Sequence, residues 1–189
     1  MPVSERRFVI RPSMMDDRGA VADLVRTRAA WLGERGLNRQ RWEMDADAIA
    51  AQSGDPAWTV WVLVDGDRIV GRTAWNTDSP PFLFTDEERA VPGLFMHGTV
   101  TDPRARGTGL LILFWAVDHA HRAGYAWVRR GAAEPGLRRY YCEVQGWRVV
   151  RAVPRQGKTV WAMSRPAEPQ PGIDEYVIEQ APVPLLHGA

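Results

Sequence analysis

The fold is decided by the stretch TVTDPRARGTG (residues 99–109), which runs directly into LLILFW (residues 110–115). A β-branched run gives way to a Pro/Arg/Gly turn, and the turn gives way to an apolar pattern with helical spacing, so the stretch predicts strand, loop and helix. The first N–H groups of a helix lack partners, and glycine lets a ligand approach the backbone closely. Arg104 and Arg106 add positive charge. The stretch therefore predicts an anion site, most naturally for a phosphate or pyrophosphate.

Two common phosphate loops do not fit this stretch. A Walker loop ends in Gly-Lys-Ser/Thr, and residues 99–109 contain no lysine. A dinucleotide-binding loop needs a third glycine three residues after Gly109, where Ile112 stands. The sequence therefore disfavours both a Walker-type nucleotide site and a dinucleotide site.

Outward from this stretch, the pattern predicts one α/β domain. A hairpin is the clearest feature, because two long apolar strands flank Asp65-Gly66-Asp67. In chain order we expect a strand at 8–12, a helix capped by residues 13–17 and ended by Gly33 and Gly36, and a helix at 41–52. The hairpin strands at 58–64 and 68–75 follow, and then a strand at 94–101, a helix ending at 122, a strand at 126–129, a helix at 137–145, and strands at 147–153 and 159–164.

Two segments fall outside this regular pattern. The connection 76–92 has three prolines and an acidic cluster, Asp86-Glu87-Glu88, and is a lid or acceptor-specificity segment or else an exposed excursion. We expect a domain over residues 1–165 and a Pro-rich extension over 166–189. This tail is either disordered or pairs with another subunit, which would make a homodimer.

Composition excludes several classes of protein. A formal net charge of +1 gives no case for binding nucleic acid. A single cysteine, Cys142, rules out an internal disulfide, and no apolar run is long enough for a bilayer span or a signal peptide. We expect a cytoplasmic protein without membrane or metal partners.

Arg104-Ala105-Arg106-Gly107-Thr108-Gly109 resembles the coenzyme A loop of the GCN5-related N-acetyltransferase (GNAT) family, Arg/Gln-x-x-Gly-x-Gly/Ala. A rival register starting at Arg106 puts Leu111 at the last small position, so we prefer the first. The order of elements over residues 8–164 is similar to that fold, an α/β (α+β) architecture with a mixed, centrally splayed sheet flanked by helices. The resemblance implies that acetyl-CoA, as co-substrate, is held by Thr99, Val100, Thr101, Arg104, Ala105, Arg106, Gly107, Thr108 and Gly109.

Residues 134–141, followed by Gly146-Trp147, resemble the family's pattern Asn-x-x-Ala-x-x-Phe-Tyr before Gly-Phe. This implies that Tyr141 is the general acid that protonates the leaving thiolate. Glu134 replaces the asparagine and one extra residue precedes Gly146, so Tyr140 stays an alternative. Cys142 is a weaker candidate nucleophile, because no base partner is evident.

His97 is the leading candidate for the general base, because histidine titrates near neutrality and this one lies in the strand before the loop. Counted back without gaps, the strand puts His97 on one face with Phe95, Thr99 and Thr101. His97 is otherwise a satisfied, partly buried histidine. Glu134 or the acidic cluster could then order a water instead.

Trp31 and Trp42 flank the first interhelical segment, which in the family lines the acceptor pocket, although core packing explains them as well. The sequence thus predicts an N-acetyltransferase that moves an acetyl group from acetyl-CoA directly to a primary amine of a small molecule or peptide. The alternative is a non-catalytic acyl-CoA-binding or regulatory domain of the same fold.

Overall fold

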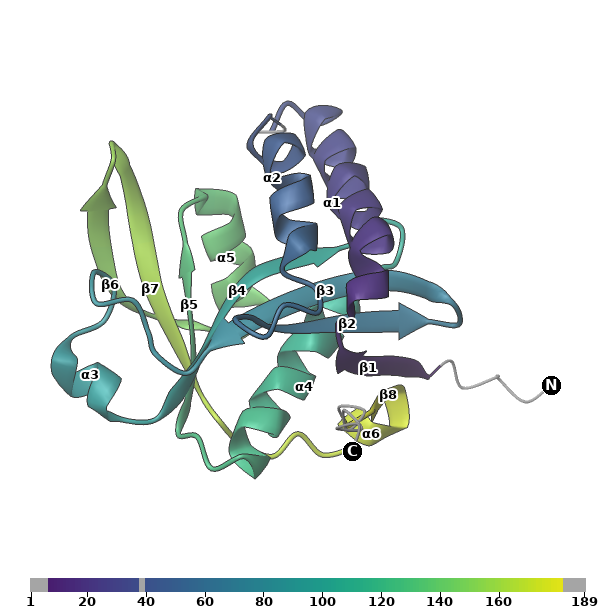
Figure 1. Ribbon diagram of the computed structural model, residues 1–189. Coiled ribbons are helices and arrows are strands. Elements are labelled where there is room, and N and C mark those ends of the chain that lie inside the picture. Colours follow the sequence, from purple (N-terminus) through teal and green to yellow (C-terminus); the bar gives the residue numbers. More distant parts are fainter. Residues whose placement is uncertain (1–6, 38–39, 182–189) are drawn as a thin grey trace. The chain divides into compact units, whose positions relative to one another are not determined.

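A computed structural model describes residues 7–37 and 40–181, with no side-chain account of residues 40–44. In these residues the strands form one mixed eight-stranded sheet in the order β6-β7-β5-β4-β3-β2-β1-β8, flanked by helices (Figure 1). The predicted α/β class is confirmed. By contacts the chain divides into two compact units, Met1–Arg72 with Val100–Thr108 and Asp174–Ala189, and Thr73–Thr99 with Gly109–Ile173. We call them unit 1 and unit 2.

Unit 1 is built on an antiparallel strand pair covered by two helices. Its elements are β1 (Phe8–Pro12), the short 3-10 helix η1 (Met15–Asp17), α1 (Arg18–Gly33), α2 (Gln40–Ala51) and β2 (Thr59–Asp65). β1 pairs with β2 from Val9↔Val64 to Pro12↔Trp61. Val21 of α1, Ala50 of α2 and Val62 of β2 share one buried cluster, and α1 and α2 lie side by side in Figure 1. β1, α2 and β2 lie within one residue of their predicted bounds and α1 follows its predicted capping segment, whereas η1 was not predicted.

The C-terminal segment adds structure that the sequence did not predict. Residues Ile173–Tyr176 form the helical turn α6 and Val177–Glu179 form the strand β8, which pairs in parallel with β1 from Phe8↔Val177 to Ile10↔Glu179. The N–H of Gln180 also donates to the carbonyl of Ile10 at 2.8 Å. Up to residue 181 the tail is therefore neither disordered nor left unpaired, since its apolar residues cover the edge of β1. Residues 182–189 of the predicted extension lie outside the described residues.

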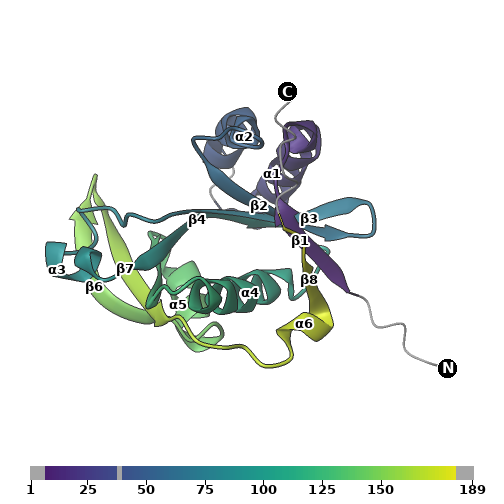
Figure 2. The ribbon, with the colours of Figure 1, turned by 60° about the horizontal axis from the view of Figure 1, so that its bottom comes forward.

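Unit 2 contains the remaining elements, and β3 and β4 begin or end in unit 1. Their bounds are β3 (Arg68–Asn76), α3 (Asp86–Ala90), β4 (Gly93–Thr101), α4 (Thr108–Arg122), β5 (Trp127–Ala132), α5 (Pro135–Glu143), β6 (Arg148–Arg155) and β7 (Lys158–Pro166). Figure 2 shows α4 and α5 on one side of the strands of this unit. Trp75 of β3 stacks on Trp115 of α4, with ring centroids 5.1 Å apart. This contact explains why the apolar stripe of α4 begins directly after the loop.

The central parallel strands of unit 2 pair over three residues only. β4 and β5 are in register at Gly93↔Trp127, Leu94↔Val128 and Phe95↔Arg129. Beyond Phe95 the residues of β4 have no β5 partner in the described part of the chain, whereas β5 continues to Ala132 along β7. Pairing with β7 carries β5 three residues beyond its predicted end at Arg129. The predicted splaying of β4 and β5 is therefore visible in their pairing, which stops after Phe95.

The connection before β4, residues 77–92, is anchored to the core of unit 2. Leu83 and Phe84 are each 2% exposed and share a buried cluster with Phe95 and Ala162. Arg129 donates to the carbonyls of Glu88 and Val91, so the backbone is also tied down. The interpretation as an exposed excursion is therefore wrong for Leu83 and Phe84. A role in acceptor specificity stays a prediction.

Candidate active site

The loop between β4 and α4 is organised by one buried carboxylate. The side chain of Asp102 is 4% exposed, and its oxygens accept from the backbone N–H of Arg104 at 2.9 Å, from Nε and Nη2 of Arg104 at 3.0 Å and from Nη2 of Arg68 at 3.0 Å. The N–H of Asp102 itself donates to the carbonyl of Val70 at 2.8 Å. These bonds fix the direction in which the chain leaves β4.

The two arginines of the loop are in different situations. Hydrogen bonds from Arg104 are the main reason why the pKa of Asp102 is lowered, and the same contact raises the pKa of Arg104. Much of the charge of Arg104 is thus balanced by Asp102. Arg106 is exposed, and within the described residues its guanidinium has no hydrogen-bond partner. Arg106 is therefore the loop cation whose charge is available to a ligand.

The backbone of the loop suits an anion. Its first turn is closed by a bond from the N–H of Ala105 to the carbonyl of Asp102, and Oγ1 of Thr108 donates to the carbonyl of Ala105 at 2.8 Å. Gly107 has a φ of +82°, a conformation that glycine adopts without strain. α4 begins at Thr108, and the first four N–H groups of a helix have no partner inside it. A phosphate is the ligand that such a helix start accommodates most readily.

β4 carries the predicted general base in one continuous strand whose backbone departs from the regular conformation at Gly98. Gly98 has a φ of +57°, and a glycine in this region within a strand is typical of a bulge. Phe95 and His97 stack with centroids 6.3 Å apart, so these two rings do share a face. The prediction for His97 assumed that side chains alternate regularly between the two faces of the strand from the loop back to residue 97. Gly98 interrupts this alternation. The predicted common face with Thr99 and Thr101 therefore does not follow.

The residues of β4 after Gly98 occupy separate environments. Oγ1 of Thr99 lies 2.9 Å from Oγ1 of Thr73, which joins the side chain of Thr99 to β3. The side chain of Val100 is 2% exposed and belongs to a buried cluster with Leu24 and Val25 of α1. Only the backbone of these residues is thus left for the predicted contact with a thioester.

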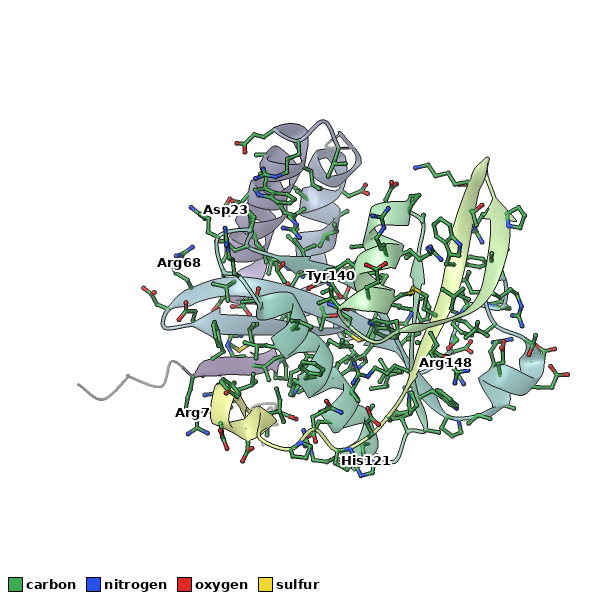
Figure 3. The ribbon with its side chains drawn as sticks, turned by 180° about the vertical axis from the view of Figure 1, so that it is seen from behind. Arg7, Asp23, Arg68, His121, Tyr140 and Arg148 are labelled. Carbon is green, nitrogen blue, oxygen red and sulfur yellow. The ribbon has the colours of Figure 1, made fainter. Side chains whose placement is uncertain are left out.

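The two tyrosines of α5 differ sharply in environment. Tyr140 is 39% exposed and is labelled in Figure 3. Tyr141 is 7% exposed, and its hydroxyl oxygen accepts a hydrogen bond from Nη2 of Arg130 in β5 at 2.6 Å. Cys142 is partly buried. Burial and the contact with Arg130 thus distinguish the two side chains, and the role of Tyr141 as the acid stays a prediction.

The alternative acids point to structural roles. Glu134 lies 3.4 Å from Nζ of Lys158, and both side chains are more than half exposed. The acidic cluster forms the first turn of α3, where Glu88 completes a capping box with Thr85 and also pairs with Arg151 at 3.2 Å. Carboxylates at a helix N-terminus are favourable there in their own right. The alternative that Glu134 or the acidic cluster orders a water stays a prediction.

The tryptophans predicted beside the acceptor are only partly described. The ring of Trp31, near the end of α1, is partly buried and has the guanidinium of Arg35 at 3.9 Å and that of Arg28 at 4.7 Å from its centroid. The side chain of Trp42 lies outside the described residues. The ring of Trp31 thus packs against two guanidiniums and is not buried between α1 and α2.

Sequence reasoning missed the side chains that hold this region together. Arg129 and Arg130 are 4% and 7% exposed, yet they lie in the middle of β5. A basic pair inside an otherwise apolar strand was the signal, because charged side chains are buried only with partners.

Among the described residues, no three His, Cys, Asp or Glu side chains gather as metal ligands would. No helix there has the length and apolar character needed to cross a bilayer.

Comparisons with known proteins identify the fold through structure alone. No family model and no curated protein sequence matches this chain. An acetyltransferase of the GNAT family from Listeria monocytogenes is 14% identical with a TM-score of 0.64, over 84% of this chain and 94% of its own. The ribosomal-protein-S18-alanine N-acetyltransferase of Escherichia coli is 12% identical with a TM-score of 0.57, over 85% and 94%.

A third similar structure contains a ligand. It is a protein of Salmonella typhimurium with its cofactor acetyl-CoA, 14% identical with a TM-score of 0.50, and the match covers 87% of this chain and 96% of that one. The identities are low, but nearly the whole length of each solved chain is matched. With its parting central strands and its loop-to-helix turn, this chain has the fold of the GCN5-related N-acetyltransferases.

Proposed function

We propose that this protein is an acetyl-CoA-dependent N-acetyltransferase that transfers the acetyl group directly to a primary amine. The observation that carries the proposal is the turn from β4 into α4, where Gly107 has a positive φ and helix N–H groups follow an exposed arginine. A pyrophosphate is the group of coenzyme A that such a turn fits. The fold shared with acetyltransferases, one of them bound to acetyl-CoA, supports the same assignment.

In the proposed reaction the loop Arg104 to Gly109 holds the pyrophosphate, chiefly through backbone N–H groups and Arg106. A backbone N–H of Thr99, Val100 or Thr101 donates to the thioester carbonyl and stabilises the oxyanion that forms when the amine attacks. His97 removes a proton from the amine directly or through water. The C–N bond forms, the C–S bond breaks, and Tyr141 donates its hydroxyl proton to the departing thiolate.

The acceptor is a primary amine of a small molecule or a peptide. One protein of the same fold is named for acetylating an alanine of a ribosomal protein, which supports a peptide amine as one class. The 77–92 segment is our candidate for the acceptor-specificity element, because it is anchored to the core while its acidic residues remain at the surface.

The proposal is tested by measuring free thiol released from acetyl-CoA over a panel of small amines and peptides, beside calorimetric titration with acetyl-CoA. We expect micromolar to millimolar binding and thiol release that depends on one amine class. Binding without turnover on any amine would favour the non-catalytic acyl-CoA-binding alternative. Failure to bind acetyl-CoA at all would refute the proposal.

Two variants assign the roles. Tyr141→Phe should lower kcat by about 10²- to 10³-fold with little change in acetyl-CoA affinity, because it removes only the proton donor. Tyr140→Phe is the matched control on the same helix and should stay within about twofold, since that hydroxyl is exposed. His97→Ala should flatten the pH profile of kcat/KM near neutrality, and an unaltered profile would remove His97 as the base.

A further inference from the structure

Arg130 makes an unusual contact with the proposed acid. Its Nη2 lies 2.6 Å from the hydroxyl oxygen of Tyr141, and its guanidinium carbon lies 3.6 Å from the centroid of the same ring. Both side chains are 7% exposed. The guanidinium of Arg130 therefore fixes both the position of the Tyr141 oxygen and the plane of the Tyr141 ring. A hydrogen bond alone would not fix both.

This buried cation has little else to balance it. The ring of Trp147 is the next aromatic surface, with its centroid 5.3 Å away, and Nε has no hydrogen-bond partner among the described residues. Within the same residues no carboxylate lies at ion-pair distance from Arg130. Burial lowers the pKa of Arg130, but an arginine in a protein stays charged. The group beside it that can become an anion is Tyr141.

Arg138, Tyr140 and Trp147 flank Tyr141 along the chain. Arg138, one turn earlier on α5, has its guanidinium 5.3 Å from the ring centroid of Trp161. From its own helix, Tyr140 approaches with its ring, at 6.0 Å between centroids. From the segment after α5, Trp147 donates its indole N–H to Gln145 at 3.0 Å. From β5, the charged group that contacts the Tyr141 hydroxyl and ring is Arg130.

The reaction supplies a reason for this pairing. An ordinary phenol titrates near pH 10 and an alkyl thiol near 8.5, so transfer of a proton from phenol to thiolate is unfavourable by about thirtyfold. A cation next to the phenol oxygen stabilises the phenolate and reduces this difference. Proton transfer is most efficient when donor and acceptor are closely matched.

We propose that Arg130 is a positioning residue for Tyr141, holding the phenol in place and stabilising the phenolate left behind when Tyr141 protonates the thiolate of coenzyme A. The inference rests on the proposed function, because it assigns Tyr141 the role of acid. In the step, the O–H bond of Tyr141 breaks and an S–H bond forms on the coenzyme. The phenolate then remains beside Arg130 until it takes a proton from water.

The test compares Arg130→Met, which keeps the length but removes the charge, with Arg130→Lys, which keeps a cation. Absorbance of the phenolate is followed during a pH titration, and the signal of Tyr141 is isolated by subtracting the titration of Tyr141→Phe. We expect the phenolate to form at a pH at least one unit higher in Arg130→Met than in the wild type, and Arg130→Lys to fall between them.

Kinetics provide the second measurement. Arg130→Met should lower kcat about tenfold or more with KM for acetyl-CoA within about twofold, and Arg130→Lys should recover part of the loss. In a Tyr141→Phe background the Arg130→Met change should have no further effect on kcat, because it acts through the hydroxyl. Thermal melting of each variant shows whether it is folded. If Arg130→Met does not fold, Arg130→Lys against the wild type still decides the titration.

The outcomes separate the two proposals. An unchanged Tyr141 titration in a folded Arg130 variant, or an additive loss of kcat in the double variant, overturns the role of Arg130 even if the enzyme is active. Absence of turnover in the wild type, or a Tyr141→Phe variant with full activity, refutes the proposed function instead. In that case a shifted titration still establishes that Arg130 stabilises the phenolate.

Discussion

The segments on the two sides of β4 are held by opposite means. Before β4, residues 77–92 are held by the buried cation Arg129, which donates to the carbonyls of Glu88 and Val91 and to Oγ of Ser79. After β4, the loop is held by the buried anion Asp102, which accepts from an N–H and two guanidiniums. The buried cation Arg129 is satisfied by carbonyl oxygens. The buried anion Asp102 is satisfied by N–H donors, and further N–H groups of the loop then face outward. The second arrangement is the one that suits an anionic ligand.

The largest effect on stability should come from Arg129→Met. The change removes the guanidinium donor of the Val91 carbonyl and leaves the Glu88 carbonyl with only the N–H of Val91, at 3.3 Å. We expect a loss of about 3 kcal/mol in the free energy of unfolding. Urea denaturation measures this value. Acetyl-CoA affinity should be unchanged, because the loop after β4 does not depend on Arg129.

Arg151→Met is the matched control on the same segment. Arg151 donates to the carbonyl of Leu83 at 3.0 Å and pairs with Glu88, but its side chain is 37% exposed. We expect a loss of about 1 kcal/mol or less. Equal losses for the two arginines would mean that Arg129 has no special role in holding the segment.

Asp102→Asn should have the next largest effect and should act on both stability and binding. An amide cannot accept from all the N–H groups that meet this carboxylate, so we expect about 2 kcal/mol of destabilisation. The loop should also lose acetyl-CoA affinity by about tenfold, as calorimetric titration would show. Asp67→Asn, at an exposed position of the β2–β3 turn, is the control and should be neutral. Full affinity in Asp102→Asn would disprove the organising role of Asp102.

Gly107→Ala should cost less in stability than either change. Alanine at a φ of +82° is strained by about 1 kcal/mol although no atom lies within 4 Å of the added Cβ. Gly19→Ala is the opposite control, because Gly19 has an ordinary helical φ and open space and should gain about 0.5 kcal/mol. Thermal melting of both variants gives the comparison. A Gly107→Ala variant as stable as the wild type would contradict the strained geometry.

The smallest effect is the contribution of Asp102 to stability in acid. Its pKa is lowered in the folded state, chiefly by the hydrogen bond from Arg104, so the unfolded state binds more protons as the pH falls. The contribution is therefore fully present above the ordinary aspartate value of about 3.9 and is lost as the pH falls through the lower folded value. Between pH 5 and pH 2 the wild type should lose more stability than Asp102→Asn. Parallel curves for the two proteins would show that the carboxylate contributes nothing.

Local pattern alone predicted most of the fold. The hairpin around Gly66, the helix after Gly109 and the final strand pair are set by alternation, helical spacing and turn residues, all of which act within a few positions of the chain. The same is true of the loop from Arg104 to Gly109. Where several apolar residues decided an element, the bounds agree to within a few residues.

The misses have a common cause in contacts between distant residues. The length of β5 depends on β7, and β8 exists because the edge of β1 accepts Val177 and Ile178. The face of His97 could not be counted because Gly98 leaves the regular strand conformation. Nothing local distinguishes a glycine that bulges from one that does not.

The sequence by itself determined the order of most elements and the strand–loop–helix turn after β4, which we propose binds an anion, because both depend on neighbouring residues. Only the tertiary structure decided which positive charges are left for a ligand. Arg104 forms an ion pair with Asp102, Arg129 donates its hydrogen bonds to backbone carbonyls, and Arg130 contacts Tyr141. Twenty-three arginines look alike in a sequence. Burial distinguishes them, because a charge removed from water must find its partner inside the fold.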